Sequence, residues 1–145
     1  MNLDALSLIP HQQPMVFIDH VCEHGEDYAQ AQLKISPELM FCEAQGLPTW
    51  CSIEIMAQTV STFAGIQGRS RGQAPKIGFL LGTRKLALPK AYFQLGSTLT
   101  IRVQRQYLHE GLGQFYCEIN DQQDQISAML NVYEPEDATE INFKK

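Results

Sequence analysis

The chain has 145 residues, of which 44% are hydrophobic and 19% are charged, and its formal net charge is −5. This balance is typical of a single globular domain spanning residues 1–145, and no stretch approaches the ~18 consecutive apolar residues of a membrane span. A chain this acidic, with no basic motif interleaved with aromatic residues, is a poor candidate for nucleic-acid binding. No basic region precedes the apolar residues of the N-terminus, so we expect no signal peptide and a cytoplasmic protein.

Two strands are predicted before the middle of the chain. Residues 15–21 form an apolar run that reads as a first strand. Residues 29–35 alternate apolar and polar side chains, which is the pattern of a half-buried strand. The pair Ser36-Pro37 ends this second strand.

A long apolar helix follows. Thr49 is a plausible N-cap, because its hydroxyl oxygen can accept from a free N–H group of the first turn. From Trp50 onward, apolar residues recur at helical spacing at positions 53, 57, 60 and 64, and residues 56 and 63 add an adjacent apolar stripe. Gly65 and Gly68 are predicted to end the helix. Since both flanks are apolar, we expect other elements to wrap around the helix.

Four further strands are predicted after the helix. The first lies within residues 76–88, and three alternating segments follow at residues 99–103, 115–119 and 126–132, separated by turns at 109–113 and 120–123. Residues 134–145 are a polar tail. One helix enclosed by an antiparallel sheet is an α+β solution, and a sheet curled around a single helix is the hot-dog fold.

Glu54 is the only charged residue between Ala44 and Gly68. An ionised carboxylate in apolar surroundings is costly, and burial moves its pKa toward the range useful for proton transfer. Gln58, one turn later, is placed to hydrogen-bond this carboxylate. The four cysteines and four histidines show no metal-ligand spacing, and we expect neither a metal nor a cofactor.

The charges are segregated along the chain. Residues 55–109 contain eight basic residues and no acidic one. These bases either neutralise the chain's own acids in the fold or form a surface for an anionic partner. The bases that we consider for such a surface are Arg69, Arg71, Arg84 and Lys85.

Three segments resemble the FabZ-type β-hydroxyacyl-acyl-carrier-protein dehydratases, within the FabZ/FabA-like superfamily. Ile9–Val21 (IPHQQPMVFIDHV) resembles the family's opening, Leu47–Gln58 (LPTWCSIEIMAQ) its central-helix motif, and Gly78–Pro89 (GFLLGTRKLALP) its next strand. The resemblance implies removal of water from a 3-hydroxyacyl thioester carried by an acyl carrier protein. It assigns Glu54 to the departing hydroxyl, and the helix start at Thr49 and Trp50 to the thioester carbonyl.

The family's catalytic histidine is missing. It would stand fourteen residues before Glu54, where this chain has Met40, although Phe41 keeps the motif's aromatic residue. A thioether cannot accept the α-proton. His11 is the best substitute among the four histidines. In the family that the chain resembles, the histidine at the position of His11 has a structural role.

Two chains would complete such a site. The resemblance is closest to the ApeP-like dehydratase subunits of aryl-polyene clusters, and it implies that a hot-dog partner subunit supplies the histidine to Glu54 across a heterodimer interface. A homodimer is the other assembly considered. Two alternatives stay open: a hot-dog thioesterase in which Glu54 activates water, and a non-catalytic acyl-binding or structural dimer in which Glu54 has no chemical role.

Overall fold

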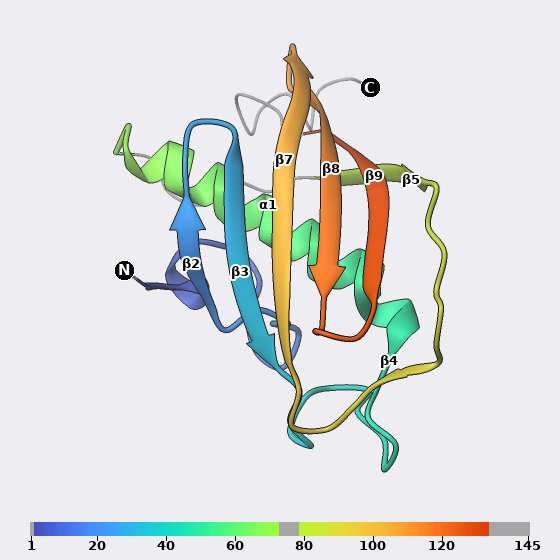
Figure 1. Cartoon of the computed structure of the whole chain (residues 1–145). Coiled ribbons are helices and arrows are strands. Elements are labelled where there is room, and N and C mark those ends of the chain that lie inside the picture. The colour runs from blue at the N-terminus through green and yellow to red at the C-terminus, as the bar shows by residue number, and fades with distance from the viewer. Residues whose placement is uncertain (1, 73–78, 134–145) are drawn as a thin grey trace, which may run out of the picture.

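The computed structural model of the protein describes residues 2–72 and 79–133. One long helix, α1 (Ser52–Arg69), crosses one face of an antiparallel sheet (Figure 1). The strands of the sheet are β1 (Leu3–Asp4), β2 (His20–His24), β3 (Tyr28–Lys34), β5 (Phe79–Arg84), β7 (Thr98–His109), β8 (Leu112–Asn120) and β9 (Gln125–Tyr133). Their order across the sheet is β1-β2-β3-β7-β8-β9-β5. This arrangement confirms the predicted α+β hot-dog fold.

A smaller ladder lies at the start of the helix. The short strands β4 (Leu47–Pro48) and β6 (Tyr92–Phe93) pair with each other, and the one-turn 3-10 helix η2 (Thr49–Cys51) leads from β4 into α1. A second 3-10 turn, η1 (Ala5–Ser7), follows β1. The start of the helix is therefore held through β4 by β6, a strand that comes after the helix in the chain.

The core forms between α1 and the inward positions of the central strands. In β3, β7, β8 and β9, alternate residues are buried, as period-two burial against one layer requires. From the helix side, the buried apolar residues are Ile55, Met56, Val60 and Phe63. The alternation predicted from the sequence in residues 29–35, 99–103, 115–119 and 126–132 is thus confirmed in this core.

The inward face of α1 includes polar residues that hydropathy alone does not select. Thr59 and Thr62 are buried, and their hydroxyls donate to the carbonyls of Ile55 and Thr59 at 2.9 and 2.6 Å. Three of the four positions in the predicted apolar stripe are only partly buried, namely Ile53, Ala57 and Ala64. One apolar side of the helix is therefore left incompletely covered by this chain.

Three local predictions are wrong. Residues 15–19 are irregular and the strand begins only at His20, because the backbone of residues 15–17 bonds to the Gln58 side chain instead of to a strand. Thr49 is not an N-cap, since its hydroxyl donates to the carbonyl of Lys90 at 2.5 Å. Gly65 does not end the helix, which continues to Arg69.

The strand predicted within residues 76–88 corresponds to β5. Its first residues, 76–78, lie outside the described part of the chain, as does the predicted tail of residues 134–145. The turns predicted at 109–113 and 120–123 are confirmed, and they join β7 to β8 and β8 to β9.

Gly65 allows the N-terminal segment to cross the helix in close contact. A Cβ atom at this position would lie 2.0 Å from the carbonyl oxygen of Leu8. We expect Gly65→Ala to lower the free energy of unfolding by about 2 kcal/mol, because overpacking outweighs the better helix propensity of alanine. Urea denaturation measures this change.

The matched control is Gly82→Ala in β5, where an added Cβ would meet nothing within 4 Å. This control should leave the unfolding midpoint nearly unchanged. Equal midpoints for the two variants would contradict the proposed steric role of Gly65.

Candidate active site around Glu54

Glu54 lies in the first turn of α1, and its side chain is 41% exposed. The sequence-based expectation of a carboxylate buried within the chain is therefore wrong. The physical reason is that the helix side carrying Ile53, Glu54 and Ala57 is the side that the sheet leaves incompletely covered. The carboxylate is accessible to a molecule or chain approaching from outside.

Gln58 holds Glu54 in place, as predicted. Its side-chain amide nitrogen donates to Oε2 of Glu54 at 2.7 Å and to the carbonyl of Met15 at 2.7 Å, while its oxygen accepts from the N–H of Phe17 at 2.7 Å. Gln58 is fully buried. Because the Phe17 N–H requires an acceptor, the amide can face Glu54 only with its NH₂ group, so the carboxylate receives a directed donor.

The hydrogen bonds of the Gln58 side chain also bring His11 beside the Glu54 carboxylate. Residues 15 and 17, bonded by Gln58, belong to the irregular segment that carries His11, and Nε2 of His11 lies 3.7 Å from Oε2 of Glu54. Nδ1 of His11 is buried and has no hydrogen-bond partner, while the side chain as a whole is 30% exposed. The structure thus places His11, the histidine singled out in the sequence as the best substitute, next to Glu54.

The helix start lies one turn before Glu54. The N–H of Thr49 donates to the carbonyl of Ala91 at 2.9 Å, so this amide is already engaged. The next residue, Trp50, lies in η2 directly before α1, and the first amide groups of a helical segment lack intrahelical acceptors. Trp50, with a side chain that is 58% exposed, is therefore the better candidate for a helix-start donor.

An aromatic stack occupies the region where the family's histidine would be. Phe41 contacts Trp50 with ring centroids 5.3 Å apart and stacks on Phe17 at 6.3 Å. Its backbone φ is 71°, an uncommon conformation for a bulky residue. Met40 packs partly buried against the core. Sequence reasoning missed Phe17, because only the fold brings it to Phe41.

An open groove and a separate cavity flank these residues. The groove runs along the helix start beside Trp50 and Leu88. The cavity, of about 350 Å³, lies toward the other end of the helix and is lined in part by Val60, Phe63 and Phe115. Glu54 and Phe63 are nine positions apart on one helix, a span of about 14 Å.

Cys51, which lies near the site, is unsuited to nucleophilic chemistry. All four cysteines are free, and burial, with smaller contributions from Glu54 and Cys42, raises the pKa of Cys51 to about 11. Cys51 is therefore a protonated thiol at neutral pH. Among the described residues, no group of three or more His, Cys, Asp or Glu side chains is arranged to hold a metal ion.

The basic segment divides into paired and unpaired residues. Arg102, Arg105 and Lys90 form ion pairs with acidic residues of the same chain. Arg69 ends the helix and donates to the hydroxyl and carbonyl of Ser7. Arg84 and Lys85 are adjacent and exposed at the end of β5, and neither forms an ion pair with a described residue. Of the bases considered for a partner surface, Arg69 is thus bonded to the chain itself, whereas Arg84 and Lys85 are exposed and can contact a partner.

An antiparallel sheet around one long helix, with a carboxylate held by Gln58 in the first helical turn, defines a hot-dog protein. The family model for ApeP-like proteins (ApeP dehydratase) matches residues 3–142. The chain therefore belongs to the ApeP-like family and is a dehydratase-like subunit.

Solved structures share this fold, and one of them is a dehydratase complex. The dehydratase heterocomplex ApeI:P from Xenorhabdus doucetiae matches with a TM-score of 0.86 and 29% sequence identity, over 96% of this chain and 95% of that chain. Zebra fish thioesterase superfamily member 2 matches with a TM-score of 0.63 and 11% identity, over 90% of each chain. A hypothetical thioesterase with coenzyme A from Streptococcus pneumoniae matches with a TM-score of 0.58 and 12% identity, over 79% of this chain and 86% of that chain.

The two thioesterase matches show the shared fold alone, because their identities are low. A comparison with curated proteins found no match. Within residues 2–72 and 79–133, no helix is long and apolar enough to cross a membrane.

Proposed function

We propose that this chain supplies Glu54 to a composite 3-hydroxyacyl-thioester dehydratase site whose base is a histidine of a partner hot-dog subunit. The observation that carries the proposal is the exposure of a carboxylate that Gln58 holds in one orientation. The position of the family's histidine is occupied by Met40, which cannot accept a proton. The chain thus presents the acid of the proposed acid–base pair, Glu54, on the helix side that the sheet leaves incompletely covered.

In the proposed reaction, the partner's imidazole removes the proton from C2 of the 3-hydroxyacyl thioester. The C2–C3 double bond forms as the C3–O bond breaks, and protonated Glu54 gives its proton to the departing hydroxyl, which leaves as water. The N–H of Trp50 is placed at the helix start to stabilise negative charge on the thioester carbonyl.

The free edge of the sheet supports a partner subunit. Within the described residues, β5 is the terminal strand and pairs on one side only, with β9. Leu80 and Leu81 of this strand are exposed. An exposed apolar edge strand is a template for pairing with another chain, and monomeric proteins usually protect such edges. We place a second hot-dog subunit here, either a His-bearing partner or a second copy of this chain.

The distance of 3.7 Å between His11 and Glu54 favours a second candidate, in which one chain carries both groups. Dehydration of a 3-hydroxyacyl-acyl-carrier-protein substrate should be measured with the purified chain alone and after mixing with a His-bearing hot-dog subunit. The composite site requires that activity appear only in the mixture. Activity of the chain alone that disappears in His11→Gln would instead assign the reaction to the single-chain pair.

The same assay separates other reaction types. Release of free thiol without dehydration would identify a thioesterase that uses Glu54 to activate water. Neither reaction in any mixture would identify an acyl-binding or structural subunit. The two low-identity thioesterase matches do not favour the first of these outcomes, since the fold hosts many functions.

Arg84 and Lys85 are proposed to contact the acidic acyl carrier protein. The double substitution of both residues to Gln should weaken carrier-protein binding about threefold to tenfold at low ionic strength, since each exposed ion pair contributes ~0.2–1 kcal/mol. The loss should shrink at high salt, where exposed charges are screened. Titration of labelled carrier protein at two salt concentrations measures both values.

A double variant of equal charge change, Lys34→Gln with Arg102→Gln, serves as the control. Lys34 is exposed at the end of β3, and Arg102 is already paired with Glu23 at 3.6 Å. If both double variants weaken binding equally, net charge rather than the end of β5 attracts the carrier protein.

A further inference from the structure

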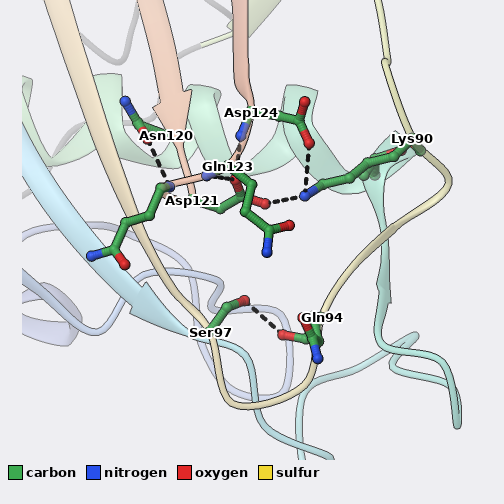
Figure 2. Close-up of polar contacts among 9 residues, drawn as sticks. Lys90, Gln94, Ser97, Asn120, Asp121, Gln123 and Asp124 are labelled. Carbon is green, nitrogen blue, oxygen red and sulfur yellow. Dashed lines mark hydrogen bonds and ion pairs between the residues drawn. The ribbon is translucent and has the colours of Figure 1, made fainter.

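A partly buried ionic cluster lies outside the groups assigned to the reaction. Nζ of Lys90 contacts Oδ2 of Asp121 in a short hydrogen bond and lies 3.1 Å from Oδ2 of Asp124 (Figure 2). The side chain of Lys90 is 24% exposed, and that of Asp121 only 4%. Burying these charges is costly, so an arrangement of this kind needs nearly complete pairing.

Asp121 is held rigidly by its own turn. Its Oδ1 accepts from the N–H groups of Gln123 and Asp124 at 3.0 and 2.8 Å, and its N–H donates to the Asp124 carbonyl at 3.2 Å. Burial alone would raise the pKa of Asp121, but its bonds to Lys90 and to the two amides outweigh this effect and lower the pKa. Lys90 therefore meets, on the β8–β9 turn, a carboxylate whose ionised form is favoured.

The backbone at Lys90 meets the helix start. The carbonyl of Lys90 accepts from the Thr49 hydroxyl at 2.5 Å, and the next carbonyl, that of Ala91, accepts from the Thr49 N–H at 2.9 Å. Directly afterwards, β6 pairs with β4, which leads into η2. The segment that holds the first residues of the helix is thus tied to the β8–β9 turn through the side chain of Lys90.

The link matters because residues 85–89, between β5 and Lys90, form no strand or helix and are mostly exposed. Without the ion pair, the segment at residues 90–91 would keep its bonds to Thr49 but would lose this attachment to the β8–β9 turn. Thr49 is followed by Trp50, whose N–H is the proposed carbonyl donor, and Glu54 lies four residues further along the helix. A shift of this segment would therefore move the donor relative to the carboxylate.

We propose that Lys90, through its contacts with Asp121 and Asp124, is a positioning residue that holds the Thr49–Trp50 helix start in register with Glu54. This inference rests on the proposed dehydratase function, and it assigns a catalytic consequence to residues that touch neither substrate nor the reacting atoms. The expected effect is on the rate of the chemical step, because an error of about 1 Å in the placement of a reacting or stabilising group can cost as much as ~10²-fold.

The test is steady-state kinetics of the reconstituted, active dehydratase complex. Lys90→Met should lower kcat about tenfold and leave KM within about twofold, since the substrate still binds but the carbonyl donor is misplaced. Lys90→Arg, which can keep contacts with both carboxylates, should restore most of kcat. The matched control is Lys34→Met, the same substitution at an exposed lysine, which should leave both constants unchanged.

Asp124→Asn covers the case in which Lys90→Met does not fold. Asp124 is the more exposed partner, and its loss leaves the contact between Lys90 and Asp121 in place, so the variant should fold and lower kcat about twofold to threefold. If Lys90→Met folds, wild-type kcat in both variants would overturn the positioning role. If Lys90→Met does not fold, wild-type kcat in Asp124→Asn alone would overturn it. So would a rise in KM at constant kcat.

Parallel assays of Glu54→Gln keep this result separate from the proposed function. If Glu54→Gln is inactive while the Lys90 and Asp124 variants retain full kcat, the positioning inference fails alone. If Glu54→Gln is fully active, the proposed function itself fails.

Discussion

Replacing Glu54 with Gln should reduce kcat for dehydration by about 10²–10⁴-fold, the range typical for loss of a general acid–base group. The substitution is nearly isosteric, and the new amide oxygen can still accept the hydrogen bond that Gln58 now donates to Oε2 at 2.7 Å. The substituted side chain therefore keeps its place and loses only the transferable proton. Activity should be measured in the complex that contains the His-bearing subunit.

The control for this variant is Glu38→Gln. Glu38 is exposed in the segment after β3 and has no ion pair with a described residue, so it offers the same chemical change without a role in the site. The control should retain wild-type kcat, and both variants should unfold at the wild-type temperature. A fully active Glu54→Gln complex would contradict the proposed function, because the departing hydroxyl would then be protonated by another group.

Replacing Gln58 with Leu should have the second largest effect, because it changes stability and activity together. The substitution leaves the Phe17 N–H, the Met15 carbonyl and one oxygen of Glu54 without their present partner. Each unsatisfied buried group costs ~1–3 kcal/mol, and partial access to water reduces the sum, so we expect a loss of about 3 kcal/mol in the free energy of unfolding. Urea denaturation tests this value.

The activity of Gln58→Leu should fall at least tenfold even at temperatures where the variant is fully folded, because Glu54 and the segment carrying His11 lose their common support. Gln67→Leu is the matched control on the same helix. Gln67 makes a single exposed hydrogen bond, to the Glu26 carbonyl at 3.2 Å. Equal losses of stability in the two variants would show that the three hydrogen bonds of the Gln58 side chain contribute no more than one surface hydrogen bond.

Much of the fold follows from local patterns. Strands such as β3 and β8 alternate buried and exposed residues along their length, and this period-two pattern is visible in the sequence without knowledge of their neighbours. The ends of the strands were harder to predict where the backbone bonds to a distant side chain instead of to a neighbouring strand. Residues 15–19 have the composition of a strand, yet Gln58, more than forty positions away, takes the hydrogen bonds of Met15 and Phe17.

The inward face of the helix shows a similar limit. Hydropathy selected Ile53, Ala57 and Ala64, which are only partly buried, and passed over Thr59 and Thr62, which are fully buried. A threonine that bonds to a carbonyl of its own helix can enter a core at low cost, but the sequence does not say on which side the sheet lies. The face left partly open is the one that carries Glu54, and we assign it to the substrate.

The sequence by itself determined two groups of the candidate site, one helix carboxylate and a glutamine one turn later. These facts depend only on residue identity and on the 3.6-residue turn of a helix. The tertiary structure decided the surroundings of those groups. It exposed Glu54 and brought His11 within 3.7 Å of it, and it tied the helix start to the distant β8–β9 turn through Lys90. Such contacts join residues far apart in the chain, and which of them form depends on how the packed sheet and helix lie against each other.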